Sequence, residues 1–388
     1  MRFPEFTEEW KAEQLDNIAT LSKGIGISKE QLSEDGEPCI LYGELYTKYK
    51  SEIIKQVESK TDINGSKLKR SKANDVIIPC SGETAVDIAT ARCVPFDNIL
   101  FGGDLNVISL HQYDGAFMSY QLNGKRKYDI ARVAQGVSIV HLYGEHLKAI
   151  KTYNPTLPEQ QKIAKLLSLL DDRIDTQNKI IEDLKKLKSA IIERHYNQAE
   201  KQTVFIADLG EPFNVGNLSK DDLSETGKPC IIYGELFTTY GETISQVESH
   251  TNKKEGMTLS KKGDLLFPTS TTVDAISLIA PSFINIDGVI LGGDMFGIHI
   301  NPNYNAQYLS YYFNHIANRQ LAKYAKGSTI IHLHYTDIEN AKLLLPSLEE
   351  QNRMAKCLVS LDAKINIENI FISLLKSQKI YFLYQMFI

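Results

Sequence analysis

The chain carries two copies of one pattern, and this duplication constrains its fold more than any other feature. Residues 36–49 read GEPCILYGELYTKY and residues 227–240 read GKPCIIYGELFTTY, with ten of fourteen positions identical at an offset of 191. The Gly-Gly-Asp of residues 102–104 recurs at 292–294, and the segment 135–142 recurs at 326–333. A repeat of about 190 residues is too long for a solenoid unit. The sequence therefore predicts two similar domains with a pseudo-two-fold relation.

Composition agrees with an ordinary globular protein. The 388 residues are 43% hydrophobic and 23% charged, which excludes a disordered or collagen-like chain. No run of about 18 uncharged apolar residues is present, and residues 1–5 do not resemble a signal peptide. The five cysteines are scattered without a CxxC pair, so we expect buried free thiols in a reducing cytoplasm.

The first part of each half, about 155 residues long, has a mixed pattern. Short apolar runs bounded by Gly, Pro, Asn and Asp are typical of strands, at residues 39–42, 76–78, 99–101, 265–267 and 289–291. Short helical stretches lie between them, for example at residues 306–315. We therefore expect an α/β or α+β domain with a twisted sheet. The pattern does not determine the order of its strands.

The second part of each half has the periodicity of a long helix. Apolar side chains alternate at spacings of four and three along one seam, at Ile163, Leu167, Leu170, Ile174, Ile181, Leu184 and Ile191. The second half repeats this seam at Met354, Leu358, Leu361, Ile365, Ile372, Leu375 and Phe382. Polar residues fill the remaining seam positions, at Gln177, Lys188, Glu368 and Lys379. A heptad seam of this length predicts a coiled coil, and a helix packed on its own domain is the alternative.

The order of the segments predicts how the helices pair. We expect domains at residues 1–155 and 199–345, with spacer helices at 156–198 and 346–388. A helix of about 37 residues is about 55 Å long. If the ends of the second domain lie close together, the second helix runs back beside the first. The sequence therefore predicts an antiparallel helix pair with one domain at each end, and we expect the polar seam residues to fix the helix register.

Several segments resemble type I restriction-modification DNA specificity (S) subunits. Residues 2–6, RFPEF, followed by Trp10, are similar to the usual opening of that family. Residues 158–164, PEQQKIA, with the following Leu-Ser-Leu-Leu-Asp of 167–171, resemble its helix start, and residues 348–351 and 358–365 repeat it. The C-terminal residues 385–388 are also typical, so the resemblance covers the full chain.

The resemblance implies a division of labour. Each domain would be a target recognition domain that reads one half of a bipartite DNA sequence, with the two helices as the spacer. Two methyltransferase subunits would dock on the helices and domains, and nuclease/translocase subunits would join the complex. S-adenosylmethionine would then be bound by the methyltransferase partner, and we expect no cofactor on this chain.

Missing motifs favour a non-catalytic chain. The [DNS]PP[YFW] motif of N6-adenine methyltransferases is not present, and neither is a Gly-rich S-adenosylmethionine loop or a P-loop. The nine histidines show no metal-ligand spacing, so we expect no metal site. The Gly-Gly-Asp segments are interpreted as tight turns. His141 and His332 match between the halves, and we expect them either near DNA or packed in the domains.

Candidate DNA contacts are matched between the halves, although the net charge of −5 does not favour nucleic acid. Basic clusters suited to phosphates lie at Lys67, Lys69, Arg70, Lys72, Lys125, Arg126, Lys127 and Arg132, and at Lys253, Lys254, Lys261, Lys262, Arg319, Lys323 and Lys326. Candidates for base reading are Tyr42, Glu44, Tyr49, Ser81 and Thr84, with Tyr233, Glu235, Tyr240, Ser270, Thr271 and Thr272. The Tyr-Gly-Glu segments could equally be structural strand ends.

Two other functions remain open from the sequence. A stand-alone methyltransferase or nuclease would need the catalytic motifs that are missing here. A coiled-coil scaffold with paired protein-binding heads needs none. Because the two halves are so similar, we also predict related half-sites, close to an inverted repeat.

Overall fold

The computed structural model describes residues 2–253 and 255–387, which form two compact units. Unit 1 comprises Met1–Lys179 and Asn369–Ile388, and unit 2 comprises Ile180–Glu368. Both unit boundaries fall inside long helices, α7 (Leu157–Gln198) and α12 (Leu348–Gln385). Each unit is therefore one α/β domain together with one end of each long helix. We call the α/β domain of unit 1 domain 1 and the α/β domain of unit 2 domain 2.

Domain 1 is built on two four-stranded sheets. The first has the order β2-β10-β6-β8 and is antiparallel throughout: β2 (Ala19–Lys23), β10 (Leu105–Leu110), β6 (Asp75–Pro79) and β8 (Arg92–Val94). The second has the order β4-β3-β9-β5: β4 (Lys60–Thr61), β3 (Glu37–Ile40), β9 (Leu100–Phe101) and β5 (Lys69–Arg70). Two ribbons complete it: β1 (Lys11–Gln14) with β12 (Lys151–Asn154), and β7 (Ser81–Gly82) with β11 (Val140–His141).

Domain 2 repeats this arrangement with an extra strand in each sheet. One sheet has the order β14-β24-β20-β22-β17: β14 (Gly210–Asn214), β24 (Met295–Ile300), β20 (Asp264–Pro268), β22 (Ser282–Ile284) and β17 (Thr243–Ile244). The other has the order β15-β18-β16-β23-β19: β15 (Leu223–Ser224), β18 (Ser249–Thr251), β16 (Lys228–Ile232), β23 (Ile290–Gly292) and β19 (Thr258–Leu259). Its ribbons are β13 (Gln202–Phe205) with β26 (Lys342–Leu345), and β21 (Ser270–Thr271) with β25 (Ile331–His332).

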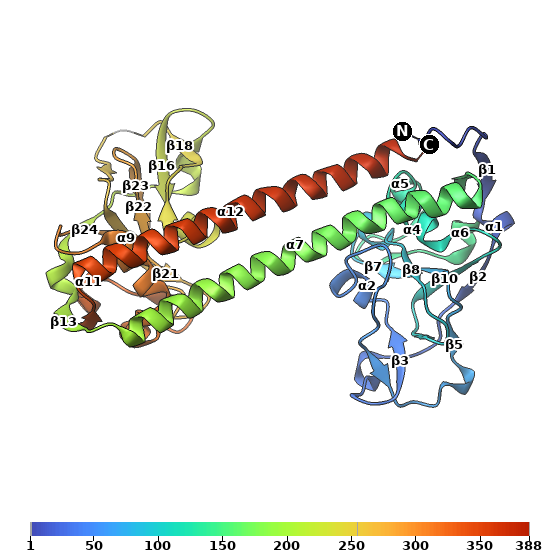
Figure 1. Ribbon diagram of the computed structural model, residues 1–388, viewed down its shortest axis with the longest axis horizontal. Coiled ribbons are helices and arrows are strands. Elements are labelled where there is room, and N and C mark those ends of the chain that lie inside the picture. The colour runs from blue at the N-terminus through green and yellow to red at the C-terminus, as the bar shows by residue number, and fades with distance from the viewer. Residues whose placement is uncertain (1, 254, 388) are drawn as a thin grey trace. The chain divides into compact units, whose positions relative to one another are not determined.

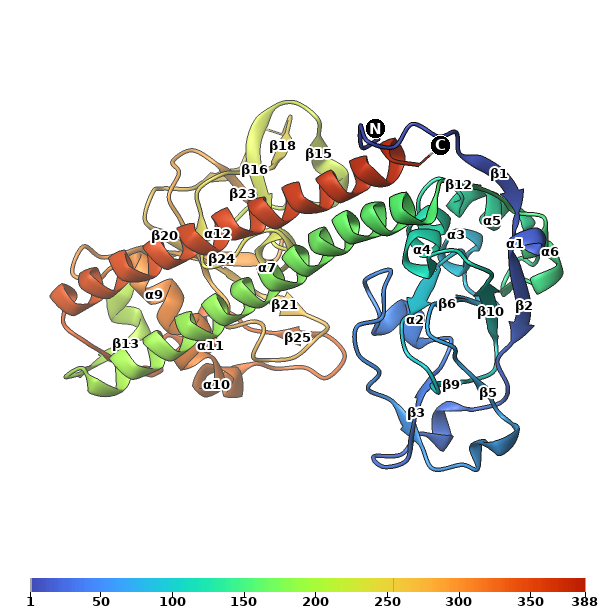
Figure 2. The same ribbon diagram turned by 45° about the vertical axis from the view of Figure 1, so that its right-hand side comes forward.

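Short helices cover these sheets, as Figure 2 shows for α4 beside β6 and β10. Domain 1 has α1 (Leu15–Ile18), α2 (Glu44–Thr47), α3 (Ala85–Ile88), α4 (Gly115–Asn123), α5 (Lys127–Val133) and α6 (Gly144–Lys148). Domain 2 has α8 (Glu235–Thr238), α9 (Ala306–Tyr312), α10 (Asn318–Leu321) and α11 (Tyr335–Ile338), and a π-helical turn, Phe313–Ala317, joins α9 to α10. The predicted helical stretch at 306–315 therefore ends in this turn.

The cores follow from apolar strands that are buried on both faces. All five residues of β6 and all five of β20 are buried. Val76 and Ile78 pack with Met118 and Leu122 of α4, while Ile77 packs against the second sheet. Because side chains alternate across a strand, one strand supplies both layers of the core. This explains why these segments read as continuous apolar runs.

Both long helices begin with the same local construction. The Gln160 side chain accepts a hydrogen bond from the Asp114 N–H at 2.9 Å and donates one to the Pro155 carbonyl at 2.8 Å. Gln351 makes the same two bonds in the second half, with the Asn305 N–H and the Pro346 carbonyl, both at 2.9 Å. The glutamine of the repeated helix-start motif therefore fixes the first turn of each helix to its domain.

Figure 1 shows the two long helices, α7 and α12. Their burial pattern follows the predicted seam. Every apolar seam residue is buried or half-buried, and so are Gln177, Lys188, Glu368 and Lys379. Several apolar residues outside the seam are exposed, for example Leu169 at 51%. The helices have 42 and 38 residues, compared with the 37 expected, and are about 63 and 57 Å long.

Within each unit the two helices run antiparallel. In unit 1 the start of α7 packs on the end of α12, because Ile163 and Leu167 share a cluster with Leu383 and Met386. In unit 2 the end of α7 packs on the start of α12, where Ile192 clusters with Met354 and Leu358. Opposed directions at both ends agree with the antiparallel pair expected from the order of the segments.

Four of the five cysteines are buried, as expected, and one is exposed. Cys39, Cys80, Cys93 and Cys230 are buried free thiols, but Cys357 is exposed. Burial raises the pKa of the Cys39, Cys80 and Cys230 thiols to about 11. Cys357 lies on α12 outside the seam, where the helix faces solvent. In the described part of the chain, no helix is long and apolar enough to cross a membrane.

Candidate nucleic-acid interface

Domain 1 has an open cleft of about 930 Å³ along one end of its sheets. Its lining comes from segments far apart in the sequence, among them Tyr42, Tyr46, Ser81, Asp104, Ile139 and His141. Tyr42 and Tyr46 are 39% and 37% exposed. The cleft therefore offers aromatic faces together with hydroxyl, carboxylate and imidazole groups.

A strand ribbon, two side-chain hydrogen bonds and a tight turn hold these side chains in place. The β7–β11 ribbon sets His141 opposite Ser81. The Ser81 hydroxyl is 3.3 Å from Asp104 Oδ2, and the Tyr46 hydroxyl donates to the Ser81 carbonyl at 3.1 Å. Asp104 closes the Gly-Gly-Asp segment with φ of 58°, so this segment is the tight turn that the sequence predicts.

Domain 2 brings the equivalent groups together. Its β21–β25 ribbon sets His332 opposite Ser270, and the Ser270 hydroxyl is 2.9 Å from Asp294 Oδ2. Asp294 and His332 line a cleft of about 600 Å³ with Lys326 and His334. Tyr233 and Phe237 occupy the positions of Tyr42 and Tyr46 and are 36% and 37% exposed. Both domains therefore have a serine–aspartate contact with a histidine opposite the serine. They also have an exposed aromatic pair at matching sequence positions, in which Tyr46 of domain 1 is exchanged for Phe237 of domain 2.

A narrow loop projects at the edge of each cleft. In domain 1, Gln135 and His141 exchange backbone hydrogen bonds of 2.9 and 2.7 Å, and Gly136 turns the chain with φ of 123°. Val137 and Ile139 are consequently 97% and 61% exposed. Lys326, His332 and Gly327 build the same loop in domain 2, where Ile330 is 50% exposed.

Tyr46 and Ile139 are not among the candidates predicted from the sequence. Both lie in segments that recur at the same offset, which was the available signal. Exposed apolar side chains on a polar rim are suited to contacts with a macromolecule.

One predicted base-reading pair, Glu44 and Glu235, makes hydrogen bonds within the domains instead. Glu44 is only 6% exposed and accepts hydrogen bonds from the Leu41 N–H at 2.9 Å and from the Ser59 hydroxyl. Glu235 repeats this with the Ile232 N–H at 2.9 Å and the Ser249 hydroxyl at 2.6 Å. These carboxylates close the turn that carries Tyr42 or Tyr233. These contacts are those of the structural alternative, a strand end, and they leave the Glu44 carboxylate turned away from the surface.

Several other candidates are also turned inward. Tyr49 is buried, and the Tyr240 hydroxyl accepts the Glu248 N–H at 3.1 Å. Burial raises the pKa of both phenols. Ser270 and Thr271 are buried, which leaves Thr272 exposed. Thr84 is exposed and caps α3 by accepting the Asp87 N–H at 3.1 Å.

The described members of the first pair of basic clusters do not line the two clefts. Lys67 and Lys72 are exposed, Lys69 is half-buried, and Arg70 is paired with Glu37 at 2.6 Å. The hydrogen bond to Glu37 raises the pKa of Arg70. In domain 2 the exposed members are Lys253, Lys261 and Lys262, and Lys254 lies outside the described residues. Lys253 is 3.6 Å from Asp222.

The second pair of clusters differs between the domains. Lys125, Arg126 and Lys127 are half-buried; Arg126 lies 5.3 Å from the Tyr153 ring centre. Burial, with Arg92 nearby, lowers the pKa of Lys127. Arg132 is the one exposed member of this domain 1 cluster. Fewer of its side chains are therefore accessible to phosphates than the sequence predicts. Its domain 2 counterparts Arg319, Lys323 and Lys326 are all exposed, and Lys326 pairs with Asp337 at 2.5 Å.

Among the described residues no cluster of three or more His, Cys, Asp or Glu side chains could hold a metal ion. The groups that gather in the clefts are hydrogen-bonding and aromatic. Such groups suit recognition of base edges and of exposed rings.

A family model for the type I restriction modification DNA specificity domain matches the chain twice, over residues 7–186 and 198–376. The chain belongs to the type I restriction-modification DNA specificity family. Each match covers one domain and most of the helix that follows it, which is the duplicated unit seen in the sequence. The chain is thus a non-catalytic DNA specificity subunit of a restriction-modification complex, as the resemblance implied.

Curated relatives and solved structures agree with this membership. The chain is 24% identical to the type I restriction enzyme MjaVIII specificity subunit of Methanocaldococcus jannaschii, over 93% of this chain and 88% of that one. A putative MjaX specificity subunit of the same organism is 26% identical over 57% of this chain and 55% of its own.

The fold is similar to the crystal structure of a type I S subunit from M. genitalium, with a TM-score of 0.64 and 16% identity over 100% of this chain and 97% of that one. A chain from a structural study of type I complex assembly and conformational transition gives 0.59 at 15% identity, with 97% of each chain covered. The two-domain, two-helix fold is therefore that of specificity subunits.

Proposed function

We propose that domain 1 and domain 2 each read one half of a bipartite DNA site, and that α7 and α12 set the distance between the halves. The observation that carries this proposal is the duplicated cleft. Asp104 and His141 line the cleft of domain 1, and the matching Asp294 and His332 line the cleft of domain 2. Tyr42 of the domain 1 cleft has its sequence match in the exposed Tyr233. A chain that needed one binding site would not maintain the same open constellation twice on one pair of helices.

The chemistry of the clefts supports base reading. Asp104 and Asp294 are acceptors suited to the amino groups of cytosine or adenine, while serine and histidine side chains can pair with either type of edge. The exposed Ile139 and Ile330 suit the methyl group of thymine. The exposed lysines outside the clefts, such as Lys72 and Lys262, would meet phosphates and fix the orientation of each domain.

The outer face of α12 supports the proposal that two methyltransferase subunits dock on the helix pair. A second apolar stripe runs along this helix at a heptad spacing, and its members are between 44% and 62% exposed: Ile367, Ile370, Leu374, Tyr381 and Tyr384. An exposed stripe of this kind is suited to a helix of a partner. We further propose that S-adenosylmethionine binds to those partners and that nuclease/translocase subunits join the same assembly.

Gel shifts with the chain and its co-expressed methyltransferase test the proposal. Tyr42→Ala should weaken binding about 5- to 150-fold by removing a contact worth about 1–3 kcal/mol, and should relax specificity in one half-site only. Tyr233→Ala should relax the other half-site. Tyr128→Ala is the matched control, because Tyr128 is 55% exposed on α5 and does not line the cleft.

Three results would contradict the proposal. Unchanged affinity and specificity in both cleft variants would remove the clefts from recognition. A complex that binds no DNA would support the scaffold alternative. Methylation of DNA by the chain alone, supplied with S-adenosylmethionine, would support the stand-alone enzyme.

A further inference from the structure

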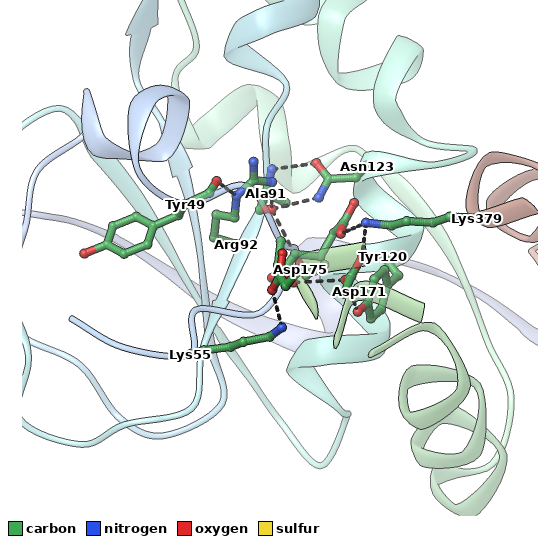
Figure 3. Close-up of polar contacts among 12 residues, drawn as sticks. Tyr49, Lys55, Ala91, Arg92, Tyr120, Asn123, Asp171, Asp175 and Lys379 are labelled. Carbon is green, nitrogen blue, oxygen red and sulfur yellow. Dashed lines mark hydrogen bonds and ion pairs between the residues drawn. The ribbon is translucent and has the colours of Figure 1, made fainter. Parts of the chain in front are cut away.

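Unit 1 contains a buried cluster of charged groups where domain 1 meets the long helices (Figure 3). Lys379 of α12 places its Nζ atom 2.6 Å from Asp171 of α7 and 2.5 Å from Glu52 of domain 1. Asp171 also accepts hydrogen bonds from the Tyr120 hydroxyl at 2.7 Å and the Ser51 hydroxyl at 2.9 Å. The exposed fractions of the Lys379, Glu52 and Asp171 side chains are only 14%, 9% and 5%.

Unit 2 contains the same cluster, built from the matching residues. Lys188 of α7 lies 2.7 Å from Asp362 of α12 and 2.9 Å from Glu242 of domain 2. The Tyr311 hydroxyl donates to Asp362 at 2.5 Å. The lysines, aspartates and tyrosines of the two clusters are all related by the offset of 191, and the glutamates by 190. His315, 2.9 Å from Glu242, is the principal addition in unit 2.

The lysine of each cluster comes from the other half of the duplicated sequence. Domain 1 and the start of α7 supply Glu52, Asp171 and Tyr120, but the lysine of that half is Lys188. Lys188 follows Asp171 by 17 residues on one continuous helix, a separation of about 26 Å. It therefore cannot reach the carboxylates of its own half, and Lys379 takes that position instead.

A cation is needed at this position because the carboxylates cannot reach bulk water. Burial alone would lower the pKa of Lys379, but Glu52 and Asp171 outweigh it and raise the pKa. Lys379 therefore stays charged in the fold. Removing one partner of a buried ion pair is costly, since the remaining charge is left without compensation.

The cluster of unit 1 also connects to the segment that carries the cleft. The Glu52 carbonyl accepts hydrogen bonds from the Cys93 N–H at 2.8 Å and the Ser119 hydroxyl at 2.9 Å. Arg92, next in the chain to Cys93, donates to the Tyr49 carbonyl at 2.8 Å and lines the cleft. In unit 2, Ser310 makes the equivalent bond to the Glu242 carbonyl at 2.7 Å. In unit 1 a few hydrogen bonds therefore connect the charged cluster to a residue that lines the cleft.

We propose that Lys379 and Lys188 are positioning residues, each of which holds the recognition domain of the opposite half of the sequence on the helix pair. Lys379, at the end of the second helix, orients domain 1. Lys188, near the end of the first helix, orients domain 2. The assignment crosses the order of the sequence, because each lysine follows one domain along the chain and acts on the other.

Hydrogen exchange on the full-length chain with its methyltransferase partner, without DNA, tests this assignment. Lys379→Met keeps the aliphatic stem and removes the charge, and it should raise amide exchange at least about tenfold in residues 49–55 and 91–95. Domain 2 should remain as in the wild type. Lys188→Met should raise exchange around residues 240–246 and leave domain 1 unchanged. Lys379→Arg, which retains the charge, should restore most of the protection.

Exposed lysines on the same helices provide matched controls. Lys376→Met and Lys185→Met should alter neither domain. The proposal is overturned if Lys379→Met loosens domain 2, or if it changes domain 1 no more than Lys376→Met does. Should Lys379→Met fail to fold, Glu52→Gln must loosen domain 1 alone, and an effect elsewhere or none overturns the proposal equally.

A DNA arm connects the positioning role to the proposed function, on which it rests. In gel shifts Lys379→Met should relax the half-site that Tyr42→Ala relaxes, and Lys188→Met the half-site of Tyr233→Ala. If the expected exchange patterns appear but neither the lysine variants nor the cleft variants change either half-site, the proposed function is overturned and the positioning role stands. If the cleft variants change the half-sites but the lysine variants do not show the exchange patterns, the positioning role is overturned and the proposed function stands.

Discussion

At the scale of single residues, charge is buried where each domain meets the long helices, and this makes stability depend on pH. Burial alone would raise the pKa of Glu242, but His315 and Lys188 outweigh it and hold it at about 2. Tyr311 and Asp362 complete the surroundings. A carboxyl with a depressed pKa stabilises the fold above its unfolded value near 4.5, and this contribution is lost as the pH falls toward 2.

Glu242→Gln should therefore lower the free energy of unfolding at pH 7 by on the order of 3 kcal/mol, and less at lower pH. Denaturant unfolding at a series of pH values from 7 to 2 measures this. Glu225→Gln, at an exposed glutamate of domain 2, should leave the profile unchanged. Parallel profiles for wild type and Glu242→Gln would show that the Glu242 carboxylate contributes no pH-dependent stability.

Single residues were also the hardest features to predict. Identity between the copies selected Glu44 and Glu235, which close turns, alongside Tyr42 and Tyr233, whose rings are exposed. A repeated residue is retained equally well for folding or for binding, so the pattern alone could not separate them. Lys188 and Lys379 were visible as polar seam positions, but their carboxylate partners come from distant segments that only the fold brings together.

At the scale of elements, helix periodicity determined the seam because one face of each helix is buried along its length. Strand order was not predictable, since β3 pairs with β9 and β6 with β10 across long stretches of sequence. The seam makes a direct prediction from two neighbouring leucines of α7. Leu167 is fully buried, whereas Leu169 is 51% exposed.

Leu167→Ala should lower the free energy of unfolding by about 2–5 kcal/mol, because it leaves a cavity in the cluster with Leu383 and Met386. Leu169→Ala should change it by less than about 0.5 kcal/mol. Thermal or denaturant unfolding of the two variants measures the difference. Equal effects would mean that the buried seam does not stabilise the helix pairing.

At the scale of the whole molecule, a duplicated sequence yields two equivalent domains that share one pair of helices. We propose that these helices set the distance between two DNA half-sites. One heptad inserted into both α7 and α12 preserves the seam and lengthens each helix by about 10.5 Å. At about 3.4 Å per base pair, that length corresponds to about three base pairs.

Methylome sequencing of a host that carries the chain and its methyltransferase partner, with and without this double insertion, is the most direct test. We expect a bipartite motif whose two half-sites are unchanged and whose spacer grows by about three base pairs in the insertion variant. Methylation at the original spacing by the lengthened chain, or at a single uninterrupted motif, would contradict it.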